Sequence, residues 1–180
     1  MRNIEIKARI GSLSKSKDDL IDLFKRNAID ISPETHFSIF QRDIFFRSEK
    51  GRLKARVINN HSAELIFYVR ENSPQSKLST YWRSPLQDFA SMEQILTELH
   101  GKLGEVSKAR EVYLFKNTRI HLDQVAGLGD FLELEVVLKP EETEEEGHQT
   151  VAWFMQQLGI NPSDLLSKSY FEMLSEHSNI

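Results

Sequence analysis

Apolar and polar residues alternate along most of this chain. In RNIEIKARI, Arg2 to Ile10, isoleucine or alanine occupies every second position from Ile4 on, and the positions between carry mainly charged residues. Such alternation is typical of β-strands, whose successive side chains point to opposite faces. It predicts eight strands, at Asn3–Ile10, His36–Phe46, Arg52–Ile58, Ala63–Arg70, Leu78–Arg83, Glu105–Tyr113, Thr118–Val125 and Phe131–Leu138.

Helical spacing of apolar residues interrupts this pattern. Two helices are predicted between strands, at Lys17–Asn27 and Leu86–Leu103. Two more are predicted near the C-terminus. One runs from about Glu144 to Leu158 and ends at Gly159, and the next begins at NPSD, where Asn161 can cap.

The predicted strands favour a closed sheet. Short connections such as SEKG and NNHS join neighbouring strands, which indicates antiparallel pairing. Eight antiparallel strands tend to close because open edges are a liability, and the lumen of such a barrel can hold one small ligand. We therefore expect an α+β fold with a closed eight-stranded antiparallel barrel and outer helices, in a single domain spanning 1–180.

Composition narrows the chemistry. The 180 residues include no cysteine, which excludes disulfides, thiolate metal sites and a cysteine nucleophile. No signal-like segment or bilayer-length apolar run is present, so we expect a soluble cytoplasmic protein that binds no membrane. The net charge of −4 argues against nucleic-acid binding, although it averages over the acidic run PEETEEEGH and basic clusters elsewhere.

Charged residues on the polar parity recur in most of the strands, and two readings follow. In one, a solvated outer face carries them. In the other, they point into a barrel. The second explains why the signs are sorted, since RLKAR is purely basic and LELEV purely acidic. Like charges two residues apart repel unless opposite charges lie among them, so the sorting suggests a polyanion held by Lys and Arg and a divalent cation held by carboxylates.

Five motifs occur in order and on matching parity, namely NIEIKAR, GRLKAR, VSKAREVY, RIHLDQVAGLGDFLELEVVL and SYFEML. They resemble the CYTH superfamily of triphosphate tunnel metalloenzymes. NIEIKAR is similar to the family's Glu-x-Glu-x-Lys, GRLKAR to its Leu-Arg-x-Arg strand and VSKAREVY to its Val-x-Lys-x-Arg strand. RIHLDQVAGLGDFLELEVVL resembles its Arg-x-x-Leu-Asp … Gly-x-Phe-x-Glu-x-Glu signature, and SYFEML its C-terminal tyrosine helix. The resemblance implies a tunnel with charge inside, into which Glu5, Lys7 and Arg9 point. Asn3 departs from the family pattern, because it replaces the first Glu and so removes a charge from the metal site.

The resemblance also implies roles. Phosphate-binding candidates are Lys7, Arg9, Lys54, Arg56, Arg70, Lys108, Arg110 and Arg119. Candidate ligands for Mg²⁺ or Mn²⁺ are Glu5, Asp123, Glu133 and Glu135. Glu5, Lys7, Glu133 and Glu135 are the candidate catalytic residues, with a metal-bound water attacking the terminal phosphorus.

Other polar residues stay open at this stage. Arg52 and Glu64 fit either a tunnel mouth or a solvated strand end, and Asp43 is unassigned. His121 is interpreted as a hydrogen bonder in the lumen, because the six histidines show no metal-ligand spacing. Tyr68 and Tyr81 could contact an organic group or be buried tyrosines with satisfied hydroxyls.

Three functions compete. The first is metal-dependent hydrolysis of a small triphosphate, either organic or inorganic. The sequence argues against a P-loop nucleotidase and a serine hydrolase as alternatives to it, because it has neither a P-loop nor a Gly-x-Ser-x-Gly elbow. The second is an adenylyl cyclase, although only Met1 and Arg2 precede Asn3, where family cyclases carry a His-Phe pair. The third is a polyphosphate-binding module without activity. We expect a monomer or a homodimer.

Overall fold

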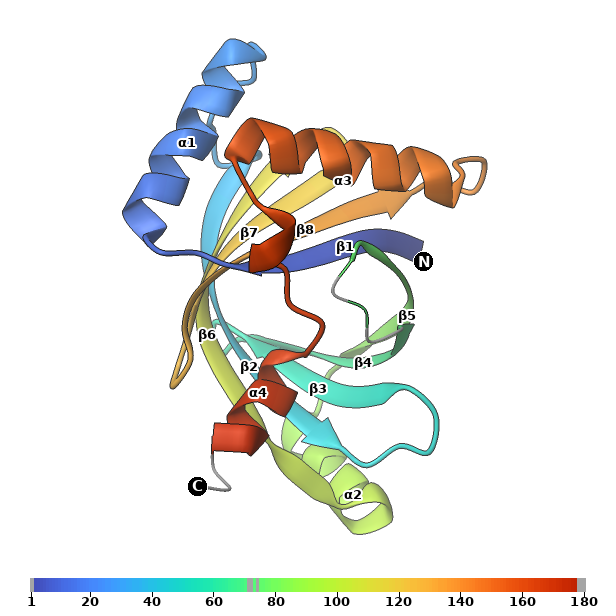
Figure 1. The fold of residues 1–180 in the computed structure, drawn as a ribbon. Coiled ribbons are helices and arrows are strands. Elements are labelled where there is room, and N and C mark those ends of the chain that lie inside the picture. The colour runs from blue at the N-terminus through green and yellow to red at the C-terminus, as the bar shows by residue number, and fades with distance from the viewer. Residues whose placement is uncertain (1, 71–72, 74, 178–180) are drawn as a thin grey trace.

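The computed structural model describes residues 2–70, 73 and 75–177 (Figure 1). Eight strands lie in this part of the chain: β1 Arg2–Arg9, β2 His36–Phe46, β3 Arg52–Ile58, β4 Ser62–Arg70, β5 Lys77–Leu86, β6 Lys102–Phe115, β7 Thr118–Val125 and β8 Gly129–Leu138. The helices within it are α1 Leu13–Arg26, α2 Phe89–His100, α3 Glu144–Leu158 and α4 Tyr170–His177, with a 3₁₀ turn at Pro162–Asp164.

The strands close into an antiparallel barrel in the order β1-β5-β4-β3-β2-β6-β7-β8. β1 completes the ring by pairing with β5 along one edge and with β8 along the other. Register is continuous at this seam, where Glu5 lies opposite Glu135 and Lys7 opposite Glu133. The closed eight-stranded barrel predicted from the alternation is confirmed.

The apolar parity of β1, β7 and β8 faces outward and is covered by α1 and α3. Ile4, Ile120 and Leu134 are fully buried in this layer, together with Phe24 of α1 and Phe154 of α3. Figure 1 shows both helices against the same side of the barrel. The inner parity of these strands is thereby left to polar residues.

Helix α3 lies close to β1 because of a glycine. A Cβ built on Gly147 would lie 2.5 Å from Cγ1 of Ile4, so no larger residue fits without displacement. A capping box begins the helix, in which Thr143 and Glu146 satisfy each other's backbone N–H groups. Gly159 ends it in the left-handed conformation, as the sequence predicts.

Helix α2 covers the opposite side of the barrel and is shorter than predicted. It packs Leu96 against Ile44 and Phe46. The side chain of Asp88 accepts a hydrogen bond from the Ser91 N–H and starts the helix, so Leu86 stays in β5. At the other end Gly101, with φ of 74°, ends the helix, and β6 begins at the next residue.

The segment that ends in α4 covers one end of the barrel. The helix expected from Asn161 is only a 3₁₀ turn, because the chain then extends along β1, where the Leu166 N–H donates to the Lys7 carbonyl at 2.8 Å. Arg52 anchors α4 through Glu172 at 2.8 Å. Figure 1 shows this segment crossing in front of the barrel interior. Among the described residues, no helix combines the length and apolar character needed to cross a membrane.

Candidate active site

The inward parity of the strands surrounds a cavity of about 350 Å³, in the lower range of small-molecule sites. Its described lining includes eight cationic side chains and five carboxylates, an excess of three positive charges. The cations are Lys7, Lys54, Arg56, Arg70, Arg83, Lys108, Arg110 and Arg119. The carboxylates are Glu5, Asp43, Glu64, Glu133 and Glu135.

Most of the candidates from the sequence therefore face one cavity. Arg9 and Asp123 are absent from the described lining. Arg9 is exposed near the covered end of the barrel, where its guanidinium donates to the Leu128 carbonyl at 3.2 Å and lies 4.9 Å from the Phe131 ring. It shares the parity of Glu5 and Lys7 but lies beyond the cavity along the barrel axis.

Asp123 is fully buried behind the cavity wall. Its carboxylate accepts hydrogen bonds from Lys108 at 3.1 Å, from two nitrogens of Arg110 at 2.5 and 2.6 Å, and from the Tyr170 hydroxyl at 2.9 Å. Burial opposes its ionisation, but Arg110 and Lys108 lower the pKa of Asp123 below its ordinary value. With both oxygens occupied, this carboxylate positions a Lys-x-Arg pair.

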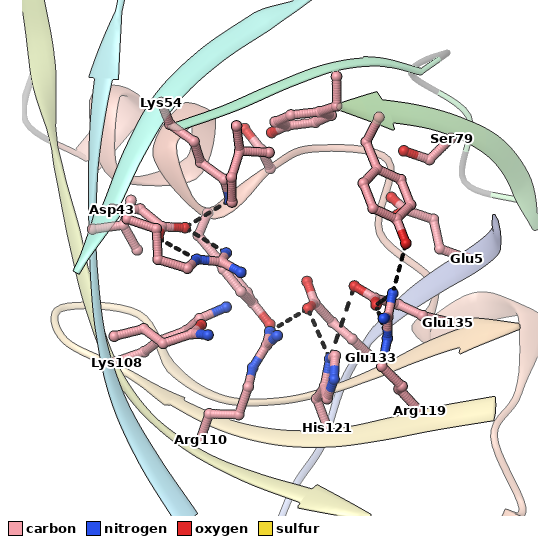
Figure 2. Close-up of a pocket in the computed structure, with 18 of the residues that line it drawn as sticks. Glu5, Asp43, Lys54, Ser79, Lys108, Arg110, Arg119, His121, Glu133 and Glu135 are labelled. Atoms are coloured by element: carbon pink, nitrogen blue, oxygen red, sulfur yellow. Dashed lines mark hydrogen bonds and ion pairs between the residues drawn. The ribbon is translucent and has the colours of Figure 1, made fainter. Parts of the chain in front are cut away.

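Asp43 repeats this arrangement on the other side of the barrel (Figure 2). Its carboxylate accepts from Lys54 Nζ at 2.7 Å and from two nitrogens of Arg56 at 2.7 and 2.8 Å. Burial opposes ionisation here too, and Arg56 and Lys54 hold the pKa of Asp43 well below its usual range. The repeated Lys-x-Arg motif in β3 and β6 was the available sequence signal, since each buried pair requires a counter-charge.

Burial also lowers the pKa of three lysines in the cavity. Desolvation, followed by repulsion from Arg56, lowers the pKa of Lys54 to about 8. Desolvation likewise lowers the pKa of Lys7 and of Lys108. A polyanion in the cavity would favour the cationic form of these ammonium groups, because a nearby negative charge raises their pKa.

Arg70 retains unused donors. One of its terminal nitrogens bonds to Glu5, while Nε and the second terminal nitrogen are buried without a hydrogen-bond partner among the described residues. A buried donor without a partner costs about 1–3 kcal/mol. A phosphate oxygen would satisfy these groups, and the planar guanidinium suits two oxygens at once.

On the opposite wall three potential metal ligands converge. Nδ1 of His121 lies 3.7 Å from Oε2 of Glu133 and 4.0 Å from Oε1 of Glu135, and one ligand atom of each residue falls within 4.8 Å of the others. Figure 2 shows the three side chains pointing toward one another. Two carboxylates and an imidazole form a donor set that fits a divalent cation.

The ionisation states in this group suit ligation. Burial opposes ionisation of Glu135, but His121 in its protonated form lowers its pKa, and Arg119 and Arg110 lower it whatever the state of His121. Glu133 is also held ionised, since Lys7 and neighbouring cations outweigh its burial and lower its pKa. Burial lowers the pKa of His121 and favours the neutral imidazole.

Asn3 lies on the same stretch of wall. It is 3% exposed, and its Oδ1 is buried without a hydrogen-bond partner among the described residues. An amide oxygen can meet a cation directly or through water. The substitution of Asn for Glu at this position therefore removes a charge and keeps an oxygen donor.

The other end of the cavity is less polar than the sequence indicates. Phe37, Ile39, Ile58 and Val112 line it, and Phe37 and Val112 lie opposite each other on β2 and β6. Phe37 is 39% exposed and marks the open mouth. Uncharged residues on the charged parity of these strands were the signal available in the sequence.

The residues whose roles the sequence left open fall into two groups, those that line the cavity and those that do not. Glu64 lines the cavity and pairs with Arg83 at 3.8 Å, whereas Arg52 is not among the lining residues and anchors α4. Both tyrosines face inward. Tyr81 accepts a hydrogen bond from Arg119 at 3.3 Å, and burial raises the pKa of Tyr68 to about 12.

A closed barrel with charges of both signs gathered inside defines a tunnel-type β-barrel protein. The chain belongs to the CYTH domain family, whose model matches residues 1–170. Members of this family act on triphosphates and depend on metal ions.

Individual proteins extend this likeness. The chain is 27% identical to "Putative adenylate cyclase MJ0240" of Methanocaldococcus jannaschii, over 96% of this chain and 98% of that protein. The structure is similar to that of the PH1012 protein of Pyrococcus horikoshii, with a TM-score of 0.78, 23% identity and coverage of 94% and 98% of the two chains. It also resembles the Pct1 RNA triphosphatase of S. pombe, with a TM-score of 0.52, 11% identity and coverage of 93% and 86%.

Proposed function

We propose that this protein hydrolyses an organic triphosphate in a metal-dependent reaction inside the barrel. The observation that carries this proposal is the convergence of eight cations on one cavity, whose lining also holds unpaired donors of Arg70 and a carboxylate–imidazole group. Family membership supports a triphosphate substrate.

The charge of the cavity suits a triphosphate together with a cation. A terminal phosphate carries about −1.5 to −2 near neutral pH, and each inner phosphate of the chain adds further negative charge. The lining has three excess positive charges, which the buried carboxylate of Asp123 behind Lys108 and Arg110 reduces to two. These charges and a divalent cation would together offset much of the charge of a triphosphate. Phosphoryl transfer depends mainly on such positioning and charge neutralisation.

The roles follow from position. Lys54 with Arg56, and Lys108 with Arg110, are held in fixed pairs by buried aspartates and bind phosphate oxygens. Arg70 contributes its two unpaired nitrogens.

Glu133 and Glu135 hold the cation, which when bound neutralises phosphate oxygens and polarises the terminal phosphorus. A water oxygen forms the new bond to that phosphorus, the anhydride bond breaks, and the diphosphate leaves. The surrounding carboxylates, Glu5 among them, orient the water and accept its proton.

The apolar mouth favours an organic substrate over inorganic tripolyphosphate. Phe37, Ile39, Ile58 and Val112 offer the phosphates no hydrogen-bonding side chains, but they can bury a ring system. Burial of apolar surface contributes about 25 cal/mol per Å². An organic group would rest there while its phosphates extend toward the charged half of the cavity.

Turnover assays test the proposal. Purified protein with Mg²⁺ or Mn²⁺ is given ATP, thiamine triphosphate or tripolyphosphate, and orthophosphate and cyclic AMP are measured. Orthophosphate release that is lost with chelator and is faster with an organic triphosphate supports the hydrolase. Tight binding without release of either product would establish a binding module instead.

Two variants of β2 test the organic group. Phe37→Ala should raise the KM for the organic triphosphate and leave that for tripolyphosphate unchanged. Phe40→Ala is the matched control, because Phe40 has similar exposure, 44% against 39%, and is not among the lining residues. Equal KM changes for both substrates, or equal effects of both variants, would contradict the assignment of the mouth.

A second function, cyclisation of ATP to cyclic AMP, is favoured by the name of the Methanocaldococcus relative. In that reaction the ribose 3′ hydroxyl attacks the α-phosphorus and pyrophosphate leaves. Pyrophosphate and cyclic AMP appearing in equal amounts from ATP, with no orthophosphate, would replace the hydrolase by the cyclase.

A further inference from the structure

The carboxylate pair on β8 has an unusual neighbour. His121 is 4% exposed and projects from β7 into the same cavity, on the parity of Arg119. Its Nδ1 is buried and has no hydrogen-bond partner within the part of the chain that the structure describes. Buried imidazole nitrogens are normally satisfied, so this atom requires an explanation.

The spacing around Nδ1 lies within the range over which ligands can share one ion. Its distances of 3.7 Å to Glu133 and 4.0 Å to Glu135 exceed hydrogen-bond lengths. For metal–ligand bonds of about 2.1 Å, two ligands of one ion lie roughly 3.0 Å apart at adjacent positions and roughly 4.2 Å apart at opposite ones. Both observed gaps fall in this interval.

The other oxygens of these glutamates are already engaged. Oε1 of Glu133 contacts Lys7 at 3.2 Å and Oε2 of Glu135 accepts from Arg119 at 2.8 Å. The oxygens nearest to His121 are Oε2 of Glu133 and Oε1 of Glu135. Oε2 of Glu133 also accepts a hydrogen bond from Arg110, and its second lone pair remains available to an ion. The cationic neighbours thus fix the carboxylates so that each turns an oxygen toward the imidazole.

We propose that His121 is a metal ligand, and that with Glu133 and Glu135 it makes a mixed nitrogen–oxygen site selective for a transition-metal ion, represented by Mn²⁺, over Mg²⁺. This inference rests on the proposed function for the location of the metal. Imidazole nitrogen is a good ligand for first-row transition ions, whereas Mg²⁺ prefers oxygen ligands and gives up its water reluctantly. The nitrogen also supplies a ligand in a barrel where Asn3 carries no charge.

Metal binding can be measured without turnover. Mn²⁺ is titrated into the full-length protein, with and without inorganic tripolyphosphate, and is observed by electron paramagnetic resonance. Pulsed spectra should show a nitrogen coupled to the ion, and the coupling should change from ¹⁴N to ¹⁵N when the protein is made with ¹⁵N-labelled histidine. Tripolyphosphate contains no nitrogen, so the signal must come from the protein.

Variants assign that nitrogen. His121→Gln should abolish the nitrogen coupling and weaken Mn²⁺ binding. Because loss of a residue that merely supports a ligand costs about 10- to 100-fold in metal affinity, loss of a ligand should cost at least as much. Mg²⁺ affinity, measured by competition, should change less. His61→Gln is the matched control, since His61 is an exposed histidine in the turn between β3 and β4.

Several results would overturn the assignment. The first is that Mn²⁺ bound to the wild-type protein shows no coupling to a histidine nitrogen. The second is that the wild-type protein binds no Mn²⁺, either with or without tripolyphosphate. The third is that His121→Gln, shown by circular dichroism to be folded, keeps the nitrogen coupling. The outcome is separable from the proposed function. Nitrogen coupling without turnover would support the metal site and contradict the proposed hydrolase activity. Turnover without nitrogen coupling would support the hydrolase activity and contradict the role of His121 as a metal ligand.

Discussion

Replacing Asp43 by Asn tests whether the charge inside the barrel is held by buried counter-ions. The substitution preserves shape and removes the charge from a side chain that is 4% exposed and accepts hydrogen bonds from Lys54 and Arg56. Removal of one partner from a buried ion pair costs about 3–5 kcal/mol. The lower end applies here, because the amide keeps one acceptor oxygen and because Lys54, with a pKa of about 8, can lose its proton.

We therefore expect Asp43→Asn to lower the free energy of unfolding at pH 7 by about 3 kcal/mol, and the melting temperature by roughly 6–12 °C. Urea unfolding followed by circular dichroism measures the difference. Asp18→Asn, on the exposed face of α1, is the matched control and should change stability by less than about 0.5 kcal/mol. A cost for Asp43→Asn as small as that of the control would refute the counter-ion role.

The pH dependence of that difference has a defined sign. The pKa of Asp43 is lowered in the folded protein, so its stabilising contribution is fully present above the unfolded pKa of about 3.9 and declines as the pH falls toward the folded pKa. The stability gap between wild type and Asp43→Asn should therefore narrow between pH 5 and pH 3. A gap that widens on acidification would contradict the assignment.

Three further perturbations follow. Glu133→Gln or Glu135→Gln should abolish metal-dependent turnover while circular dichroism stays unchanged, and retained turnover in both would remove them from catalysis. Because burial lowers the pKa of Lys54 to about 8, the substrate KM should rise as the pH passes about 8, and Lys54→Arg should reduce that rise. If the wild type and Lys54→Arg show the same dependence of KM on pH, Lys54 is not the source of the rise. Gly147→Ala should cost about 1–3 kcal/mol in urea unfolding, since its Cβ would overlap β1, whereas Gly11→Ala, where a Cβ meets nothing within 4 Å, should not; equal costs would exclude the close contact.

Alternation predicted the strands and which residues share a face, whereas the sorted charges and the family resemblance predicted that the charged face points into the barrel. Lys54 and Arg56 face the cavity, as do Glu133 and Glu135. Parity does not give depth along the barrel axis. Arg9 has the expected parity but is absent from the described lining, because it contacts Leu128 and Phe131 instead.

The register between strands was the second feature that could not be predicted from the sequence. Asp123 and Asp43 meet their Lys-x-Arg partners only because particular residues of different strands lie opposite each other, Arg110 with Asp123 and Arg56 with Asp43. The position of His121 opposite Glu133 depends on register in the same way. The sequence shows no metal-ligand spacing because the three proposed ligands come from two strands.

The segment that ends in α4 crosses one end of the barrel, where Tyr170 lines the cavity with the centre of its ring 3.7 Å from Nζ of Lys7. This arrangement would limit which polyphosphates could serve as substrates. A linear polyphosphate cannot thread through a barrel that is obstructed on one side, so only a chain terminus can enter. The protein could then remove phosphate from the end of a polyphosphate chain, but it could not cleave the chain at an internal position. Whatever fragment lies deeper must also wait for the outer fragment to depart, which imposes an order on their release.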